Sequence, residues 1–171
     1  MTPVLPVLPA LPVLPVLPAL PVLPSYDAPQ GSLVPPHRRV TVSGQSAGAS
    51  MAIQHLIAFS SSVDGAAIAA GSPYGCGMQK LHDWRCYYGG LDMEAAERYV
   101  RKRFQQGLVD DPSHLRQVPV VLFSGRRDLV VFTRVMRAVE QQLRRFVAPE
   151  RILTSYDTRA SHVWSVDHGS E

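Results

Sequence analysis

The chain has 171 residues, enough for one modest domain, with 17 Lys and Arg against 14 Asp and Glu and a formal net charge of +3. The basic residues are scattered and not interleaved with aromatic residues, so we expect a solvated surface and no nucleic-acid interface. No stretch is long and apolar enough to span a bilayer without interruption by proline, so we expect no membrane span.

The N-terminal part is a low-complexity repeat in which proline recurs at every third position over residues 3–24. Proline at this density excludes helices and central strands, and the period matches polyproline II. We therefore predict a disordered tract and linker at residues 1–37 and a folded domain at residues 38–171. The P-x-x-P pattern is typical of ligands for SH3 or WW domains, so such a partner is one interpretation. A repeat without a function is the other.

A candidate nucleophile follows the first predicted strand. Residues 40–42 are β-branched and predict a short buried strand, and GQSAG at 44–48 fits the pattern G-x-S-x-G. An apolar run with helical spacing follows at 51–57. Strand, tight turn and helix together predict a nucleophile elbow that exposes Ser46 and turns the backbone N–H of Ala47 towards an oxyanion. Both glycines are expected to avoid Cβ clashes in this turn. The alternative is an ordinary Gly/Ser-rich turn.

A second short apolar run at 65–71 predicts another buried strand. The loop that follows, at 74–91, contains the two cysteines, Cys76 and Cys86. They either form a disulfide, which would stabilise the fold by about 2–3 kcal/mol, or remain unpaired thiols. Their spacing does not match a zinc site, and no second cysteine or histidine pair completes one, so we expect no metal and no cofactor.

The rest of the chain alternates helices with strands. A helix is predicted at 92–104, with Asp92 as its N-cap, and an amphipathic helix at 132–146. Strands are predicted at 118–123 and 151–156 because both runs are rich in apolar and β-branched residues. Strands that alternate with helices favour a parallel sheet built by right-handed crossovers.

Three residues in this pattern could form a catalytic triad. Ser46, Asp128 and His162 each follow a separate predicted strand, in the chain order used by α/β-hydrolases. His162 would accept the Ser46 proton and return it to the leaving group, while Asp128 would orient the imidazole and stabilise the imidazolium. Taken alone, an aspartate at this position is more often an ordinary loop residue than a catalytic acid.

Other acids and bases are available. Asp157 and Asp167 are alternative acids, and His168 is an alternative base near the C-terminus. Asp157 is less well placed because it ends the strand that should deliver the histidine. His55 falls within the helix after the elbow, where we expect a packed or hydrogen-bonded residue.

Three stretches resemble a known family: VSGQSAGASMAIQHLIAFSSSVDGAAIAAGSPYGCG, LFSGRRDLVV and SHVWSVDHG. They are similar to the nucleophile, acid and histidine regions of extracellular poly(3-hydroxybutyrate) depolymerases, including the circularly permuted single-domain type, and the resemblance covers about residues 38–169. It implies a serine esterase that forms an acyl-enzyme on Ser46 and acts on polyesters or oligomers of short-chain hydroxyalkanoates. It also implies a disulfide between Cys76 and Cys86. No signal peptide is visible, so an extracellular location rests on the resemblance and on that disulfide.

The sequence departs from the permuted members in one respect. In those members further strands follow the histidine and supply the second oxyanion donor, whereas this sequence stops at Glu171. We therefore expect a truncated member with a partial α/β-hydrolase fold, about four mostly parallel strands with flanking helices. Loss of one oxyanion donor typically removes ~2.7–4 kcal/mol of transition-state stabilisation. Two alternatives stay open: a generic short-chain carboxylesterase, and an inactive remnant that uses its proline tract as an interaction module.

Overall fold

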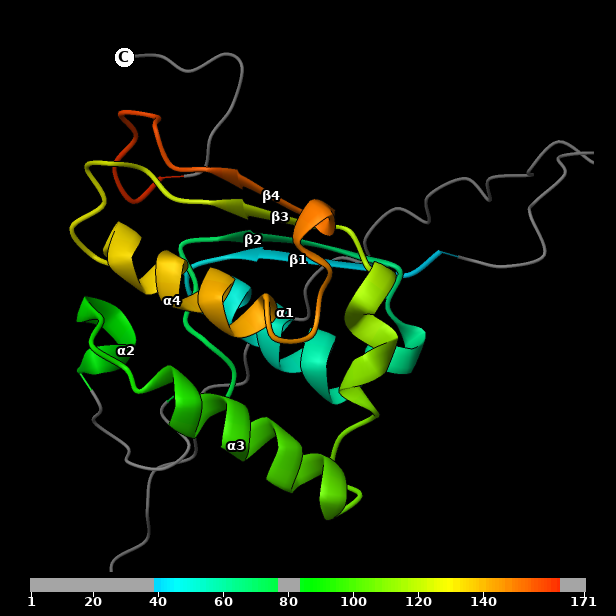
Figure 1. The fold of residues 1–171 in the computed structure, drawn as a ribbon. Helices are drawn as coiled ribbons and strands as arrows, with labels where there is room; N and C mark the ends of the chain where they lie inside the picture. Colours follow the sequence, from blue (N-terminus) through cyan, green and yellow to red (C-terminus); the bar gives the residue numbers. More distant parts are fainter. Residues whose placement is uncertain (1–38, 77–83, 164–171) are drawn as a thin grey trace, which may run out of the picture. The chain divides into compact units, whose positions relative to one another are not determined.

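The computed structural model describes residues 39–76 and 84–163. In this part of the chain four parallel strands form one sheet in the order β1-β2-β3-β4 (Figure 1). The strands are β1 Thr41–Gln45, β2 Gly65–Ala69, β3 Val120–Phe123 and β4 Ile152–Ser155. This arrangement confirms the predicted sheet of about four parallel strands. The proline tract lies outside the described residues, so the division of the chain into tract and domain stays a prediction.

The helices lie on one side of this sheet. When consecutive parallel strands are neighbours in chain order, right-handed crossovers place every connecting helix on the same face. Figure 1 shows α1 and α4 beneath the sheet and α3 beyond them. The α-helices are α1 Ala47–Ala58, α2 Arg85–Tyr88, α3 Met93–Gln105 and α4 Thr133–Leu143, and the short 3-10 turns are η1 Ser60–Ser62, η2 Pro112–Gln117 and η3 Pro149–Arg151.

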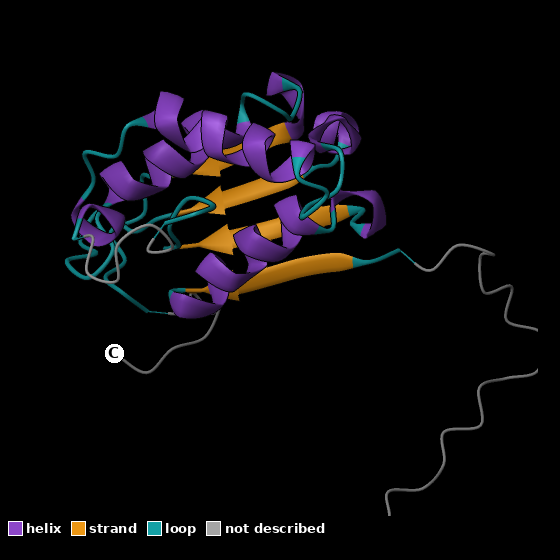
Figure 2. Cartoon of the chain, turned by 90° about the horizontal axis from the view of Figure 1, so that it is seen from below, coloured by secondary structure: helices purple, strands orange, loops and turns teal. Residues whose placement is uncertain are grey.

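The carboxyl ends of the strands meet at one edge. In Figure 2 the four arrowheads point the same way, which is the consequence of parallel pairing throughout. In open α/β sheets the loops at this edge carry the ligand chemistry. The turn at Ser46 and the loops that hold Asp128 and His162 all follow the carboxyl ends of strands, so the topology brings the three candidate catalytic residues to one edge of the sheet.

The sheet face opposite the helices is open in the described part of the chain. Ser43, Ala67, Val121 and Leu153 stand in register across the four strands, and all four are exposed. Leu153 has 66% of its surface exposed. Parallel sheets usually bury both faces, and the sequence pattern did not predict that one face would be exposed.

The hydrophobic core lies between the sheet and the helices. Its fully buried large side chains include Ile53 and Ile57 of α1, Ile68 of β2, Leu122 of β3, and Met136 and Leu143 of α4. Burial of each such side chain stabilises the fold by roughly 1.5–3 kcal/mol. The apolar stripe predicted for the last helix is therefore the stripe that packs on the sheet.

The predicted helices and strands are present, but β2 and α4 end earlier than the sequence predicts. Asp92 caps α3 as expected, because its side chain accepts a hydrogen bond of 3.0 Å from the Ala95 backbone N–H. β2 ends at Ala69, before the predicted limit, because Ala70 adopts a left-handed φ of 53°. α4 ends at Leu143, and a tight turn then keeps Phe146 buried.

The two cysteines form a disulfide, Cys76–Cys86, which confirms the pairing implied by the family resemblance. The bond closes the loop between β2 and α2. Among the described residues, no helix combines the length and the hydrophobicity needed to cross a membrane.

Candidate active site

Ser46 lies on a strained turn between β1 and α1. Its φ of 57° and ψ of −121° are unusual for a residue with a side chain, and such a conformation costs on the order of 1–3 kcal/mol. Two backbone hydrogen bonds hold the turn: the Ser46 N–H donates to Ala69 O at 2.9 Å, and the Ser50 N–H donates to Ser46 O at 3.0 Å. Strained residues concentrate at functional sites because the surrounding structure must enforce them. The local geometry is therefore a strained turn between a strand and a helix, the context that the sequence motif predicts.

The two glycines of the motif have different roles. A Cβ on Gly44 would lie 2.3 Å from the Gly48 carbonyl carbon, which is far inside van der Waals contact. A Cβ on Gly48 would meet no described atom within 4 Å apart from its chain neighbours and the backbone of its own helix. The expectation that both glycines avoid Cβ clashes is thus correct for Gly44 and wrong for Gly48, whose backbone is instead the surface that excludes a side chain at position 44.

Ala47 is the first residue of α1 and is exposed. The backbone N–H groups of the first helical turn have no acceptor within their own helix. The helix dipole adds partial positive charge at this end. The Ala47 N–H is therefore chemically suited to an anionic oxygen on a group attached to Ser46.

Asp128 is buried, and both of its carboxylate oxygens are hydrogen-bonded. It is 3% exposed, and its Oδ1 accepts the backbone N–H groups of Val130 and Val131 at 2.9 and 2.8 Å. Its Oδ2 lies 2.8 Å from Nδ1 of His162. The two N–H donors fix the plane of the carboxyl group, so the other oxygen is directed at the imidazole. The structure thus brings together two of the three predicted residues.

The loop that contains His162 is anchored to the loop that contains Asp128. The Arg126 N–H donates to Thr158 O at 2.8 Å, and the Arg127 N–H donates to Ala160 O at 3.0 Å. These backbone bonds continue the pairing of β3 and β4 beyond the ends of the strands. The position of the imidazole therefore depends on backbone contacts as well as on the hydrogen bond to Asp128.

Ser46 is not hydrogen-bonded to this pair. In the ranges 39–76 and 84–163, the Ser46 hydroxyl makes no hydrogen bond to His162 or to any other side chain. β2 separates β1 from β3, which places the ends of those two strands about 10 Å apart. Catalytic hydrogen bonds in free enzymes are often long and tighten only with substrate. The three-residue assignment stays a prediction.

The alternative residues have other surroundings. Asp157 is exposed in the loop after β4 and is hydrogen-bonded to neither His162 nor Ser46 in the described structure. His55 is exposed on α1, and its ring contacts that of Phe59 in a tilted arrangement, with ring centroids 4.9 Å apart. Asp167 and His168 lie outside the described residues.

Sequence reasoning missed polar residues that hold the loops around Ser46. The Ser50 hydroxyl donates to Ser46 O at 3.3 Å and accepts the Ser72 N–H at 3.1 Å. The fully buried Gln142 binds both backbone groups of Tyr74, accepting from its N–H at 2.7 Å and donating to its carbonyl at 3.1 Å. A glutamine on the apolar face of α4 is the sequence signal that could have drawn attention to this contact.

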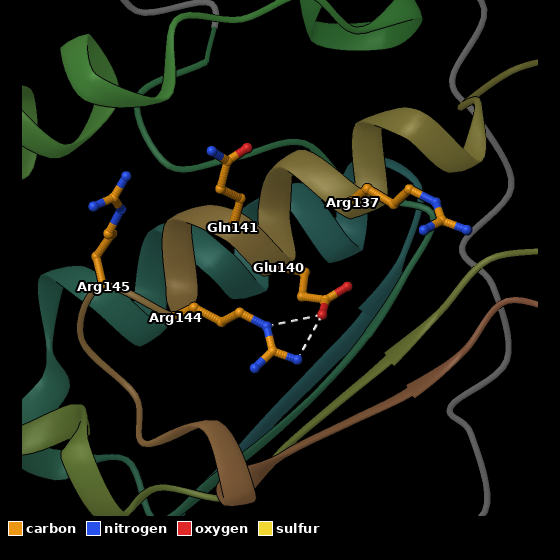
Figure 3. A pocket seen from close by; sticks show the side chains of 5 residues that line it. All are labelled: Arg137, Glu140, Gln141, Arg144 and Arg145. Atoms are coloured by element: carbon orange, nitrogen blue, oxygen red, sulfur yellow. Dashed lines mark hydrogen bonds and ion pairs between the residues drawn. The ribbon is translucent and has the colours of Figure 1, made fainter.

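A pocket of about 470 Å³ lies elsewhere, on the outer surface of α4 (Figure 3). Two of its lining residues form an ion pair, in which Arg144 donates to Glu140 at 2.7 Å. Burial, followed by the charge of Glu140, raises the pKa of Tyr156 above its usual value, so this phenol stays protonated. None of the candidate catalytic residues lines the pocket, whose lining residues are Arg137, Glu140, Gln141, Arg144 and Arg145.

Comparison with known proteins gives one consistent group. No protein-family model matches the chain. A poly(3-hydroxybutyrate) depolymerase of Delftia acidovorans is 31% identical over 134 residues, which is 75% of this chain and 27% of the relative. A crystal structure of the PHB depolymerase of Penicillium funiculosum superposes with a TM-score of 0.69 and 26% identity, over 76% of this chain and 41% of that one.

A second solved structure is a PHB depolymerase variant complexed with an R3HB trimer. It matches with a TM-score of 0.69 and 25% identity, over 75% of this chain and 41% of that one. The chain therefore spans less than half the length of the relatives that it matches. These likenesses confirm the family resemblance seen in the three sequence stretches and the α/β-hydrolase character of the fold.

Proposed function

This chain belongs to the family of the poly(3-hydroxybutyrate) depolymerases, and from that premise we propose that it is a serine esterase. The proposed substrates are polyesters or oligomers of short-chain hydroxyalkanoates, in keeping with the R3HB trimer bound to one relative. We also propose that it acts outside the cell, since its Cys76–Cys86 disulfide is of the kind that persists in oxidising compartments.

In the proposed mechanism Ser46 forms an acyl-enzyme. As the Ser46 Oγ attacks the ester carbonyl, Nε2 of His162 takes the hydroxyl proton. The oxygen of the tetrahedral intermediate becomes an anion beside the Ala47 N–H. When the intermediate collapses, the alcohol leaves with the proton from the imidazolium. Water then attacks the acyl group by the same route and restores the free serine.

One observation carries this proposal. The hydrogen bond of 2.8 Å between the buried Asp128 and His162 supports the proposal, because a triad needs this acid–base pair and it forms at the edge of the sheet where Ser46 occupies its strained turn. A buried carboxylate stabilises the imidazolium that forms when His162 takes a proton. No metal or other group is needed for this chemistry.

Ester hydrolysis by the Ser46→Ala variant tests the proposal. With p-nitrophenyl butyrate and with a 3-hydroxybutyrate trimer, we expect the full chain to hydrolyse both substrates and Ser46→Ala to lose at least about 10³-fold in kcat, as removal of a serine nucleophile does. Ser62→Ala is the matched control, because the Ser62 hydroxyl donates only to Phe59 O on the exposed end of α1. Equal hydrolysis by Ser46→Ala and the full chain would overturn the assignment.

Substrate preference separates the proposal from its alternatives. A polyester film is the discriminating substrate, because a generic short-chain carboxylesterase hydrolyses the soluble ester and leaves the film intact. Hydrolysis of neither substrate by a folded chain would favour the inactive remnant, whose proline tract then becomes the feature to study. The proposal expects release of soluble hydroxyacid from the film, measured against the Ser46→Ala variant.

A further inference from the structure

A serine on α1 contacts the strained turn that carries Ser46. The Ser50 hydroxyl donates to Ser46 O at 3.3 Å, and the Ser50 backbone N–H donates to the same oxygen at 3.0 Å. A hydroxyl that bonds back to the carbonyl four residues earlier is common in helices and by itself indicates no function. In this chain, however, the carbonyl belongs to the candidate nucleophile, whose φ of 57° the surrounding structure must enforce.

The same hydroxyl accepts a hydrogen bond from a second segment. The backbone N–H of Ser72, in the loop after β2, donates to the Ser50 Oγ at 3.1 Å. A hydroxyl has a single proton and two lone pairs, so it can accept this bond and still donate its proton to Ser46 O. The Ser50 hydroxyl therefore bridges the turn after β1 and the loop after β2.

Ser72 is itself held in place from two sides. Its hydroxyl donates to Cys86 O at 2.9 Å, both residues are buried, and Cys86 is one half of the disulfide described above. The residue before Ser72 packs closely on α1, since a Cβ on Gly71 would lie 2.7 Å from the Ala49 Cβ. These contacts keep the Ser72 N–H within reach of the Ser50 hydroxyl.

Both segments that the hydroxyl joins contain strained backbone. Among the described residues other than glycine, Ser46 and Ala70 are the two with a positive φ, at 57° and 53°. A backbone bond already ties the two segments, because the Ser46 N–H donates to Ala69 O at 2.9 Å. Strained residues persist only where several contacts over-determine their conformation. The bridge at Ser50 is one of these contacts.

The carbonyl of Ser46 and the N–H of Ala47 belong to one peptide unit. This unit is trans, and a trans peptide is planar, so its C=O and N–H point in opposite directions. Donors that fix the direction of Ser46 O therefore also fix the direction of the Ala47 N–H, which the proposed mechanism places beside the oxyanion. A hydrogen bond to the carbonyl also polarises the unit, and such cooperativity strengthens the next bond by about 10–30%.

We propose that Ser50 is a positioning residue whose hydroxyl holds the peptide unit between Ser46 and Ala47 in the orientation that binds the oxyanion. This role rests on the proposed esterase function and adds a residue that lies outside the motif at 44–48. Ser50 acts through the peptide unit and does not touch the reacting atoms. Since the oxyanion exists only in the transition state and the tetrahedral intermediate, Ser50 contributes to kcat and not to substrate binding.

Kinetics of the full chain and of two variants at position 50 test this role. With p-nitrophenyl butyrate, we expect Ser50→Ala to lower kcat about tenfold, less than the ~10²–10³-fold loss caused by removal of an oxyanion donor, because the Ala47 N–H is still present. KM should stay unchanged, since the lost interaction is made only in the transition state. Ser50→Thr keeps a hydroxyl that can bond to the carbonyl four residues earlier, so kcat should return close to that of the unaltered chain.

Ser62→Ala is the matched control for the loss of a hydroxyl. The Ser62 hydroxyl also donates to a preceding backbone carbonyl, Phe59 O at 2.9 Å, but it does so at the opposite end of α1. This variant should keep both kcat and KM. Circular dichroism and denaturant unfolding check that every variant is folded, which separates lost stability from lost positioning. Unchanged kcat in Ser50→Ala, or an equal loss in Ser50→Thr, would overturn the proposal.

NMR of the carbon-13 and nitrogen-15 labelled chain tests the contact without substrate. A carbonyl carbon resonates further upfield when its oxygen loses a hydrogen bond. We therefore expect Ser50→Ala to move the Ser46 carbonyl signal upfield and to shift the Ala47 amide signal, whereas Ser50→Thr and Ser62→Ala leave both near their original positions. If these shifts appear in a chain that hydrolyses no ester, the esterase proposal fails and the hold of Ser50 on the peptide unit stands. Unchanged signals in Ser50→Ala would overturn that hold, whatever the activity of the chain.

Discussion

The Asp128→Asn variant is expected to lose about 10⁴-fold in kcat for ester hydrolysis while it keeps its fold, as the equivalent change does in serine proteases. The reason lies in the two ends of the carboxyl group. Oδ1 accepts the N–H groups of Val130 and Val131, so the amide oxygen of asparagine must take that position. The amide NH₂ group then faces Nδ1 of His162, where Oδ2 stood at 2.8 Å.

This orientation selects the wrong tautomer. A donor facing Nδ1 leaves the proton on Nε2, and His162 then cannot accept the proton of Ser46. Asp157→Asn is the matched control, because Asp157 is exposed and lies in the same loop as His162. The measurement is kcat at saturating p-nitrophenyl butyrate for both variants. A loss below about tenfold for Asp128→Asn, or an equal loss for Asp157→Asn, would remove Asp128 from the catalytic assignment, since triad acids contribute far more than that.

The second large effect is expected from Gly44→Ala. The new Cβ would lie 2.3 Å from the Gly48 carbonyl carbon and 2.6 Å from the Ala49 nitrogen, and both are backbone atoms. The start of α1 must move away from β1, and overpacking of this kind typically lowers the free energy of unfolding by ~1–3 kcal/mol. Because Ser46 lies between the two colliding segments, we also expect about 100-fold lower kcat, the scale of loss that a shift of about 1 Å in a catalytic group produces.

Gly48→Ala makes the same chemical change four residues later and is its control. A Cβ at position 48 meets no described atom within 4 Å apart from its chain neighbours and the backbone of its own helix. Replacing glycine by alanine within a helix usually stabilises it by roughly 0.5–1 kcal/mol. We therefore expect denaturant unfolding to show Gly44→Ala below and Gly48→Ala at or above the unaltered chain. If the two variants lose equal stability, the motif's glycines are equivalent and the close contact at Gly44 is wrong.

Much of the fold could be predicted because its signals are local. Short runs of β-branched and apolar residues predicted the four strands, and apolar residues at helical spacing predicted α4. The N-cap at Asp92 needed only the three residues that follow it. The order Ser46, Asp128, His162 could be recognised because each residue follows a strand, and parallel topology gathers strand ends at one edge.

The rest depends on contacts between residues far apart in sequence. Gln142 is visible as a polar residue on an apolar helix face, but its partner Tyr74 lies 68 residues earlier. The Arg127 N–H donates to the Ala160 carbonyl where two loops pack together. No local sequence pattern predicts such a contact. The open face of the sheet follows from strand order, which alternating elements alone do not determine. The different roles of Gly44 and Gly48 depend on the close approach of their backbones, which the sequence alone does not reveal.

A covalent adduct provides the decisive measurement. A fluorophosphonate probe reacts with a serine that an adjacent base activates, and intact mass followed by peptide mapping locates the modified residue. We expect one adduct per folded chain, on Ser46, and at least about 100-fold slower labelling of His162→Ala, because without the base the hydroxyl keeps its proton. Labelling of another serine, or equal labelling rates with and without the imidazole, would contradict a triad built from these three residues.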